Sequence, residues 1–155
     1  MIKAIRVDYR LLHGQVAVTW TSAIGADCIL LVSDTVKDDP LRLEALKLAK
    51  PAGVKVVIKN TAESIEALQS GITDKYKLFV VCETIAIAKE ILGATGFRSL
   101  NIGNVPFRED ARQYGKSAFM MPEEEAMVKE MLDTGIDCFI QMVPTEKELK
   151  CKTLF

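Results

Sequence analysis

The sequence predicts a doubly wound α/β domain, with a mostly parallel sheet of about seven strands and helices on both faces. Two observations predict this fold. Short runs rich in Val, Ile and Leu alternate with longer amphipathic segments along the whole 155-residue chain. Several of the short runs are almost continuously apolar, as in strands that are covered on both faces. Because no linker, internal repeat or low-complexity segment interrupts the alternation, we expect residues 1–155 to form one domain.

The expected strands are short, and each ends at a polar residue or a turn signal. They cover residues 2–8, 28–33, 54–58, 78–82, 99–102, 116–120 and 137–143. Residues 2–8 alternate around apolar positions, whereas 28–33, 54–58 and 78–82 are apolar except for Ser33 and Lys55. The stretch 104–115 lacks either pattern, and we expect a long loop there.

The expected helices cover residues 15–24, 40–50, 84–92 and 122–132, and one more follows residues 61–64 and ends at Gly71. Asp39 followed by Pro40 is typical of a helix start, with a capping acid and a proline at the first position. Gly25, Gly71 and Gly93 mark the ends of the first, third and fourth helices.

The last expected long helix begins at Pro122, and its first turn carries three glutamates, where the helix dipole favours acids. It ends before Gly135. A short final helix is expected to begin at Thr145, with Glu148 in the capping-box position.

Composition excludes several classes of protein. The charges nearly cancel, with 20 Lys and Arg against 21 Asp and Glu, so we expect no nucleic-acid partner. The apolar runs are about five residues long, far below the roughly 20 that span a bilayer. The amino terminus lacks a secretory pattern, which favours a cytoplasmic location. The four cysteines, at positions 28, 82, 138 and 151, are interpreted as small buried residues, with a metal or disulfide role as the alternative.

Candidate functional residues lie where strands end, because open α/β sheets bind ligands at the carboxyl ends of their strands. The first loop, which follows Asp8 and contains His13, is the main candidate. The candidates for the rim of the site follow the second, fourth and fifth strands, namely Ser33, Asp34, Glu83, Thr84 and Gly103.

His13 is the only histidine of the chain. A lone histidine is often structural or on the surface, but this one precedes Gly14 and the start of a helix. The unpaired N–H groups of residues Gly14, Gln15 and Val16 would form an anion site. The sequence therefore predicts a histidine that acts as a nucleophile toward a phosphate-like group, with no metal at this loop.

Three charged residues precede His13 and complete this candidate site. Arg10 and Arg6 could bind phosphate oxygens through their guanidinium groups. Asp8 could orient the histidine or hold Arg10, or it could merely cap the loop. Trp20, seven residues after His13 on the expected first helix, is interpreted as core or interface packing, with a contact surface near the site as the alternative.

Competing motifs are absent from the sequence. After the first strand there is no G-x-G-x-x-G, and this absence argues against a dinucleotide ligand. There is also no G-x-x-x-x-G-K-[ST] phosphate loop and no G-x-S-x-G nucleophile elbow. The strand expected at 54–58 runs into Lys59 and Asn60, which argues against a receiver-type phospho-aspartate site.

The segment R-V-D-Y-R-L-L-H-G-Q-V at residues 6–16 closely resembles the signature of the IIB components of the mannose/fructose/sorbose family of the bacterial sugar phosphotransferase system (PTS). Weaker similarities follow at residues 31–34, 51–57, 101–104 and 141–144, so the resemblance covers almost the whole chain. Two positions depart from the family pattern. Tyr9 replaces a second acid, and Glu83-Thr84 replaces a Lys/Glu-Asn-Pro segment.

The resemblance implies a phosphotransferase that needs no cofactor and no Mg²⁺. His13 would accept a phosphoryl group on Nδ1 from a IIA partner and pass it to a sugar during import through membrane IIC and IID partners. Arg10 and Asp8 would assist, and Arg6 would bind phosphate. The resemblance also implies a cytoplasmic protein associated peripherally with the permease. Residues 18–26 are more similar to N-acetylgalactosamine members than to mannose members. The alternative is a non-catalytic regulatory domain that senses a phosphorylated partner.

Overall fold

The computed structural model describes residues 1–14 and 17–155 in full. In chain order the elements are β1 (Ile2–Asp8), α1 (Gly14–Ile24), β2 (Cys28–Val32), the 3₁₀ turn η1 (Val36–Asp38), α2 (Pro40–Leu48), β3 (Lys55–Lys59), α3 (Thr61–Ser70), β4 (Leu78–Cys82), α4 (Ile85–Thr95), β5 (Ser99–Asn104), β6 (Arg112–Tyr114), β7 (Ala118–Met120), α5 (Pro122–Asp133), β8 (Asp137–Ile140), β9 (Leu149–Lys150) and η2 (Cys151–Thr153).

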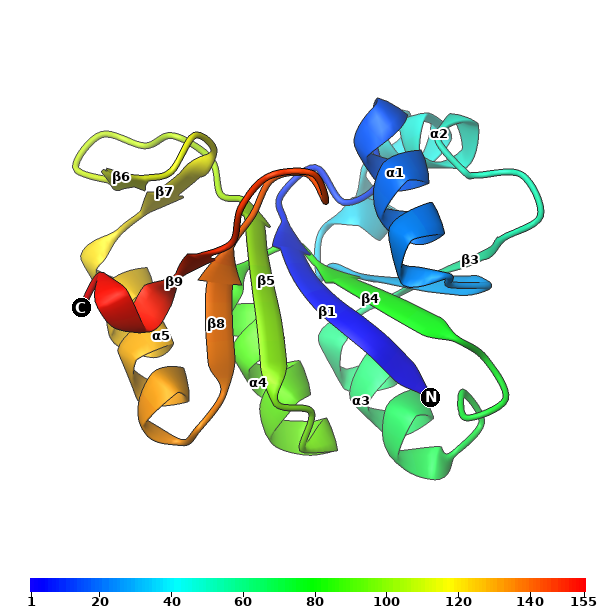
Figure 1. Cartoon of the computed structure of the whole chain (residues 1–155). Helices are drawn as coiled ribbons and strands as arrows, with labels where there is room; N and C mark the ends of the chain where they lie inside the picture. Colours follow the sequence, from blue (N-terminus) through cyan, green and yellow to red (C-terminus); the bar gives the residue numbers. More distant parts are fainter.

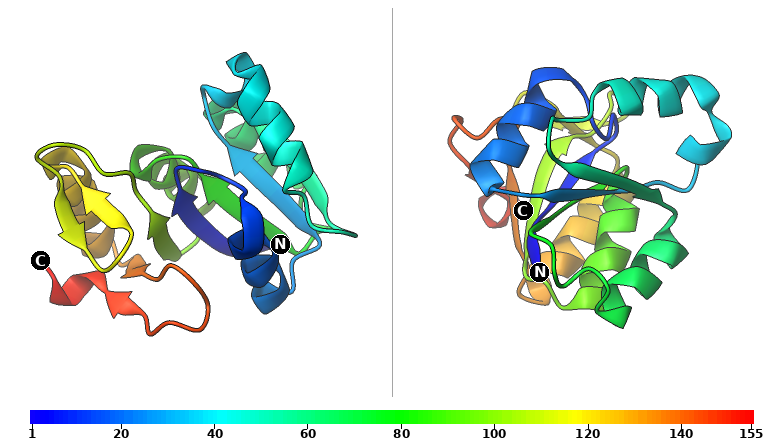
Figure 2. Two further views of the ribbon diagram at one scale, coloured as in Figure 1. Left: turned by 90° about the horizontal axis from the view of Figure 1, so that it is seen from above. Right: turned by 90° about the vertical axis from the view of Figure 1, so that its right-hand side faces the viewer.

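Seven strands form one sheet in the order β3-β2-β4-β1-β5-β8-β9. Its neighbouring strands are parallel, except for the antiparallel pair β8 and β9. Helices α1 and α2 cover one face, and α3, α4 and α5 cover the other (Figures 1 and 2). The predicted fold class is therefore confirmed.

Each face of the sheet has its own core, and alternate residues of one strand enter different cores. On β2, Leu30 packs in the larger core under α3, α4 and α5, whereas Ile29 and Leu31 pack under α1 and α2. All five residues of β2 and of β4 are buried. This two-sided burial explains why these strands are continuously apolar in sequence.

Three of the predicted elements are wrong in their place or type. Residues 104–115, expected as a long loop, contain the strand β6. The run at 116–120 corresponds to β7, which pairs with β6 in a separate two-stranded sheet. The seventh strand of the main sheet is instead β9, in the region where a final helix was expected from Thr145. There, Gln141 Nε2 donates to the carbonyl of Glu146 at 2.7 Å, and Ile140 pairs with Leu149. Tertiary pairing thus outweighs the local capping signal.

Most of the predicted helix boundaries lie within a few residues of those observed. At the start of α2, Asp39 accepts a hydrogen bond from the Arg42 N–H at 3.2 Å. Helix α4 does not end at Gly93 but continues to Thr95, because Gly96 adopts the left-handed conformation that closes the helix. Glycine within a helix costs only about 1 kcal/mol, so Gly93 does not stop it.

The four cysteines are buried and free. Burial raises the pKa of Cys138 and of Cys151 to about 12, so these thiols stay protonated at neutral pH. In the described part of the chain, no helix is long and apolar enough to cross a membrane.

Candidate functional site

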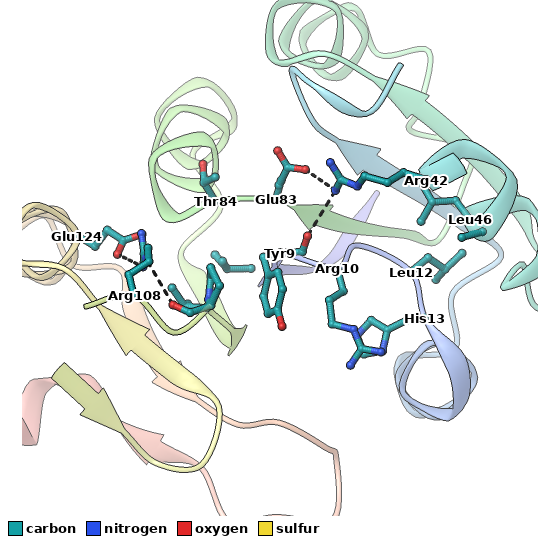
Figure 3. Close-up of a pocket in the computed structure, with 14 residues that line it drawn as sticks. Tyr9, Arg10, Leu12, His13, Arg42, Leu46, Glu83, Thr84, Arg108 and Glu124 are labelled. Atoms are coloured by element: carbon teal, nitrogen blue, oxygen red, sulfur yellow. Dashed lines mark hydrogen bonds and ion pairs between the residues drawn. The ribbon is translucent and has the colours of Figure 1, made fainter. Parts of the chain in front are cut away.

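The candidate site lies at the point where the sheet changes its winding direction. The connection after β1 leads to α1 on one face, and the connection after the neighbouring β4 leads to α4 on the other face (Figure 1). Such a switch point opens a crevice at the carboxyl ends of the two strands. A cavity of about 620 Å³ lies there, lined by Arg10, His13, Arg42, Glu83 and Thr84 among others (Figure 3).

Asp8 contacts the Nε2 edge of the His13 ring. The two side chains are joined by a 3.1 Å hydrogen bond between His13 Nε2 and Asp8 Oδ2. His13 is the N-cap residue of α1, but its side chain makes no capping hydrogen bond, so the ring is available for this contact. The His13 side chain is 14% exposed, whereas that of Asp8 is 1% exposed. The imidazole therefore lies between a buried carboxylate and the open cavity.

Two more groups fix the Asp8 carboxylate. Its Oδ1 accepts the Arg10 main-chain N–H at 3.0 Å, and its Oδ2 accepts Asn104 Nδ2 at 2.8 Å. Burial by itself raises the pKa of Asp8, but the hydrogen bond from His13, the charge of Arg6 and the hydrogen bond from Asn104 outweigh it. The net effect holds the pKa of Asp8 below its ordinary value of 3.8, and the group is a carboxylate at neutral pH.

The backbone of the loop is strained where it turns toward the helix. Leu11 has a positive φ of 61°, which costs a non-glycine residue about 1–3 kcal/mol. Its N–H donates to the Asp8 carbonyl at 2.9 Å, and its side chain is buried. Gly14 also has a positive φ, of 43°, which explains glycine at this position. The predicted phosphate contacts of Gln15 and Val16 lie outside the described residues.

The two arginines of the motif have different environments. Arg10 is exposed and lines the cavity with His13, and its guanidinium makes no hydrogen bond or ion pair within residues 1–14 and 17–155 (Figure 3). Arg6 is only 2% exposed, and its Nη2 faces Asp8 Oδ2 at 3.4 Å. Burial lowers the pKa of Arg6 to about 10, partly offset by Asp8, so the group stays charged at neutral pH. The expectation that Arg6 binds phosphate does not fit this placement, because its guanidinium has no access to the cavity.

Gly103 lies directly beside the Arg6 guanidinium. A Cβ at this position would overlap the guanidinium atoms of Arg6. Gly103 was predicted as part of the site rim, but it does not line the cavity. Its role in the structure is to leave room for a buried cation.

Two other predicted rim residues support local structure instead. The Ser33 hydroxyl accepts the main-chain N–H of Val36 at 3.1 Å and so shapes the turn after β2. Asp34 accepts the Thr61 N–H at 2.8 Å at the start of α3. Neither lines the cavity, whereas Glu83 and Thr84 do. Of the five predicted rim residues, only Glu83 and Thr84 line the cavity.

Sequence reasoning missed two ion pairs on the cavity walls. Arg42 of α2 bonds to Glu83 at 2.6 Å, and Arg108 bonds to Glu124 of α5 at 2.5 Å (Figure 3). Each pair joins segments that are distant in the sequence. Local patterns gave no signal for them, since a charged residue on an amphipathic helix is usually solvated.

The fold and the loop together define a class of protein, an α/β domain that presents one histidine at the carboxyl edge of its sheet with a carboxylate behind the ring. Comparison with known proteins identifies the family. The family model for the PTS system sorbose subfamily IIB component matches residues 2–155. This chain therefore belongs to the sorbose subfamily of PTS IIB components, which are sugar phosphotransferases. The family predicted from residues 6–16 is confirmed.

Individual relatives agree with this assignment. The N-acetylgalactosamine-specific phosphotransferase enzyme IIB component 2 of Escherichia coli is 29% identical over 142 residues, covering 91% of this chain and 90% of that protein. The mannose-specific EIIAB component of the same organism is 27% identical, and the match covers 99% of this chain and 48% of the longer protein. The crystal structure of the IIBSor domain of the sorbose permease from Klebsiella pneumoniae superposes with a TM-score of 0.90 at 22% identity, covering 97% and 93% of the two chains.

Proposed function

We propose that His13 accepts a phosphoryl group from a phosphohistidine of a IIA partner and passes it to a sugar that enters through membrane IIC and IID partners. One observation carries this proposal. A single imidazole is held by a buried carboxylate on one side and faces, on the other, a cavity that it shares with the exposed guanidinium of Arg10. A protein that catalyses phosphoryl transfer contributes mainly by positioning the reacting groups and by stabilising charge.

The hydrogen bond to Asp8 assigns the two ring nitrogens. Because the carboxylate can only accept, the neutral ring carries its proton on Nε2 and donates it to Asp8. Nδ1 then holds the lone pair and is the nucleophile. As the Nδ1–P bond forms, the N–P bond of the donor breaks, and its electron pair stays on the donor nitrogen. The carboxylate also stabilises the positive charge that develops on the ring.

Arg10 and the start of α1 supply the donors for the phosphoryl oxygens. Because Arg10 is exposed, its long side chain can follow the group between donor and acceptor. The helix begins at Gly14, whose N–H is one of the unpaired donors of a helix N-terminus. Arg6 has a different role in this proposal: it holds Asp8 and does not touch phosphate.

The names of the relatives support the choice of partners and acceptor. A mannose-specific relative combines EIIA and EIIB in one protein, which supports a IIA donor. The sugars in the three names are N-acetylgalactosamine, mannose and sorbose, which share a six-carbon sugar skeleton, so we propose a hexose or an N-acetylated amino derivative of one as acceptor. Transfer to an imported sugar places the protein at the cytoplasmic side of the permease.

Transfer of labelled phosphate from a phosphorylated IIA protein tests the proposal. The wild-type protein should acquire an acid-labile label, and His13→Ala should acquire none. Lys47→Gln, which changes an exposed charge on α2, serves as the control and should label at the wild-type rate. A His13→Ala protein that labels as fast as the wild type would refute the proposal. A wild-type protein that binds the phosphorylated partner without taking up label would favour the regulatory alternative.

Uptake measurements identify the acceptor. We expect a strain that lacks this protein to lose import of one six-carbon sugar from a panel that starts with N-acetylgalactosamine. Restoring the wild-type chain should restore that import, and restoring His13→Ala should not. Unchanged import of every sugar in the panel would contradict the proposed acceptor class.

A further inference from the structure

The indole ring of Trp20 fixes the buried guanidinium of Arg6 in two ways. The Arg6 Cζ lies 4.9 Å from the centre of the Trp20 ring, in a cation–π contact. The Trp20 Nε1 also donates to the Met142 carbonyl at 2.9 Å, and that carbonyl accepts Arg6 Nη2 at 3.0 Å. Trp20 is 8% exposed and does not line the cavity of His13.

Asn101, on β5, holds the same guanidinium through its other nitrogen. Its Oδ1 accepts a hydrogen bond from Arg6 Nη1. Its Nδ2 donates to the Gln141 carbonyl at 3.1 Å, and Arg6 Nη1 donates to that carbonyl at 2.9 Å. Asn101 is 4% exposed. Trp20 and Asn101 therefore each share a main-chain carbonyl with Arg6, so the guanidinium cannot shift without losing contacts on both sides.

The position of Arg6 in turn limits where the Asp8 carboxylate can lie. Asp8 Oδ2 faces three donors, from Arg6 at 3.4 Å, His13 at 3.1 Å and Asn104 at 2.8 Å. If the guanidinium moved away, the carboxylate would lose its buried counter-charge and could rotate from the ring. The two neutral tautomers of an imidazole are close in energy, so such a hydrogen bond decides which one is present.

We propose that Trp20 and Asn101 are positioning residues for phosphoryl acceptance. They fix Arg6, Arg6 fixes Asp8, and Asp8 holds His13 in the tautomer whose Nδ1 carries the lone pair. The proposal rests on the proposed function for the identity of the nucleophile. Trp20 also packs in the core under α1 and α2, as its place in the sequence indicated, and the proposal adds the positioning role to that packing.

The single histidine makes the tautomer directly measurable, because the only imidazole nitrogens in a long-range ¹H–¹⁵N spectrum are those of His13. Spectra are recorded at about pH 8.5, above the ordinary pKa of a histidine. The wild-type protein should show protonated Nε2 and unprotonated Nδ1. Trp20→Leu and Asn101→Ala should increase the fraction with the proton on Nδ1 and slow phosphoryl acceptance by about 10- to 100-fold, as small misplacements do.

A conservative variant and a control separate positioning from stability. Trp20→Phe keeps an aromatic face for Arg6 and loses only the indole N–H, so its rate and spectrum should lie between those of wild type and Trp20→Leu. It also decides the question if Trp20→Leu does not fold. Tyr114→Leu removes a buried aromatic that packs on Phe155 and contributes no hydrogen bond to the network, and it should lower stability while leaving the ring signals and the rate unchanged.

The outcomes distinguish this proposal from the function it rests on. Unchanged ring signals in Trp20→Leu, Trp20→Phe and Asn101→Ala would overturn the positioning role, whether or not their rates fall. If the wild-type protein accepts no phosphoryl group, the proposed function fails, while the spectra still report whether Trp20 and Asn101 set the tautomer.

Discussion

At the scale of single residues, the two arginines of the motif, Arg6 and Arg10, have different roles in the site. Arg10 and Arg6 are both arginines near His13 in the sequence, yet one is exposed at the cavity and the other is buried beneath it. An exposed guanidinium can follow a moving anion, whereas a buried one can only hold a fixed partner. Substitutions at the two positions should therefore have different signatures.

Arg10→Ala should slow phosphoryl acceptance by roughly 10²- to 10³-fold, the usual cost of losing one donor to a developing anion. The free energy of unfolding should change by no more than about 0.5 kcal/mol, because the side chain is exposed. Labelling kinetics and urea titration measure the two effects. Arg112→Ala, at another exposed arginine, is the control for loss of charge. An Arg10→Ala rate equal to the wild-type rate would remove Arg10 from the site.

Asp8→Asn should reduce phosphoryl acceptance by on the order of 10³- to 10⁴-fold, because an amide can hold the wrong tautomer of His13. It also leaves the buried Arg6 without a counter-charge, which should cost about 3–5 kcal/mol of unfolding free energy. Labelling kinetics and urea titration again measure both. Asp27→Asn, at an exposed acid that accepts the Lys77 N–H, should leave the rate unchanged. A stable, active Asp8→Asn protein would contradict the arrangement.

At the scale of elements, the site depends on how closely β1 and β5 approach each other. Strand β5 pairs with β1, and its Gly103 leaves the space that the Arg6 guanidinium fills. Asn104, at the end of the same strand, donates to Asp8. Gly103 thus makes room for the buried Arg6, and Asn104 donates a hydrogen bond to the buried Asp8. These contacts explain why β5 ends in a small residue and a polar one.

Gly103→Ala tests that fit. The added methyl group would overlap the guanidinium, so the chain should lose about 1–3 kcal/mol of unfolding free energy, and phosphoryl acceptance should fall as Arg6 moves from Asp8. Gly93→Ala is a matched control, because a methyl group there meets no atom within 4 Å and the residue is helical. That control should be neutral or stabilising by about 0.5–1 kcal/mol. Equal stability of the two variants would contradict the role of Gly103.

At the scale of the whole molecule, the buried carboxylate links stability to pH. The pKa of Asp8 is held below its ordinary value because the groups around the carboxylate outweigh its burial. A lowered folded-state pKa stabilises the protein fully above the ordinary carboxyl pKa, and this stabilisation is lost as pH falls through the lower folded-state value. The affected window therefore lies on the acid side of 3.8.

Urea unfolding of the wild type and of Asp8→Asn at about pH 6 and about pH 3 tests this linkage. The gap in unfolding free energy between the two proteins should be large at the higher pH and should shrink at the lower pH. The Asp27→Asn control should show no such change in its gap. A gap for Asp8→Asn that stays constant across this range would show that the Asp8 carboxylate does not carry the pH dependence.

The sequence alone predicted the fold class, most helices and strands, and the loop that contains Asp8, Arg10 and His13. These features depend on local information. Continuous apolar runs need two covered faces, Asp39 and Pro40 start a helix, and a parallel sheet presents its functional loops at one edge. The same local information failed near Thr145, where pairing of Leu149 with Ile140 prevails over a capping signal.

Only the tertiary structure decided what surrounds those residues. Arg6 meets Asn101 across 95 residues of sequence and Gln141 across 135, and no local pattern reports such contacts. The crossovers of a doubly wound sheet bring distant strand ends together, so burial, and with it the role of each charged group, is set by the packed whole. The sequence identified the residues of the loop, and packing decided which of them hold the others in place.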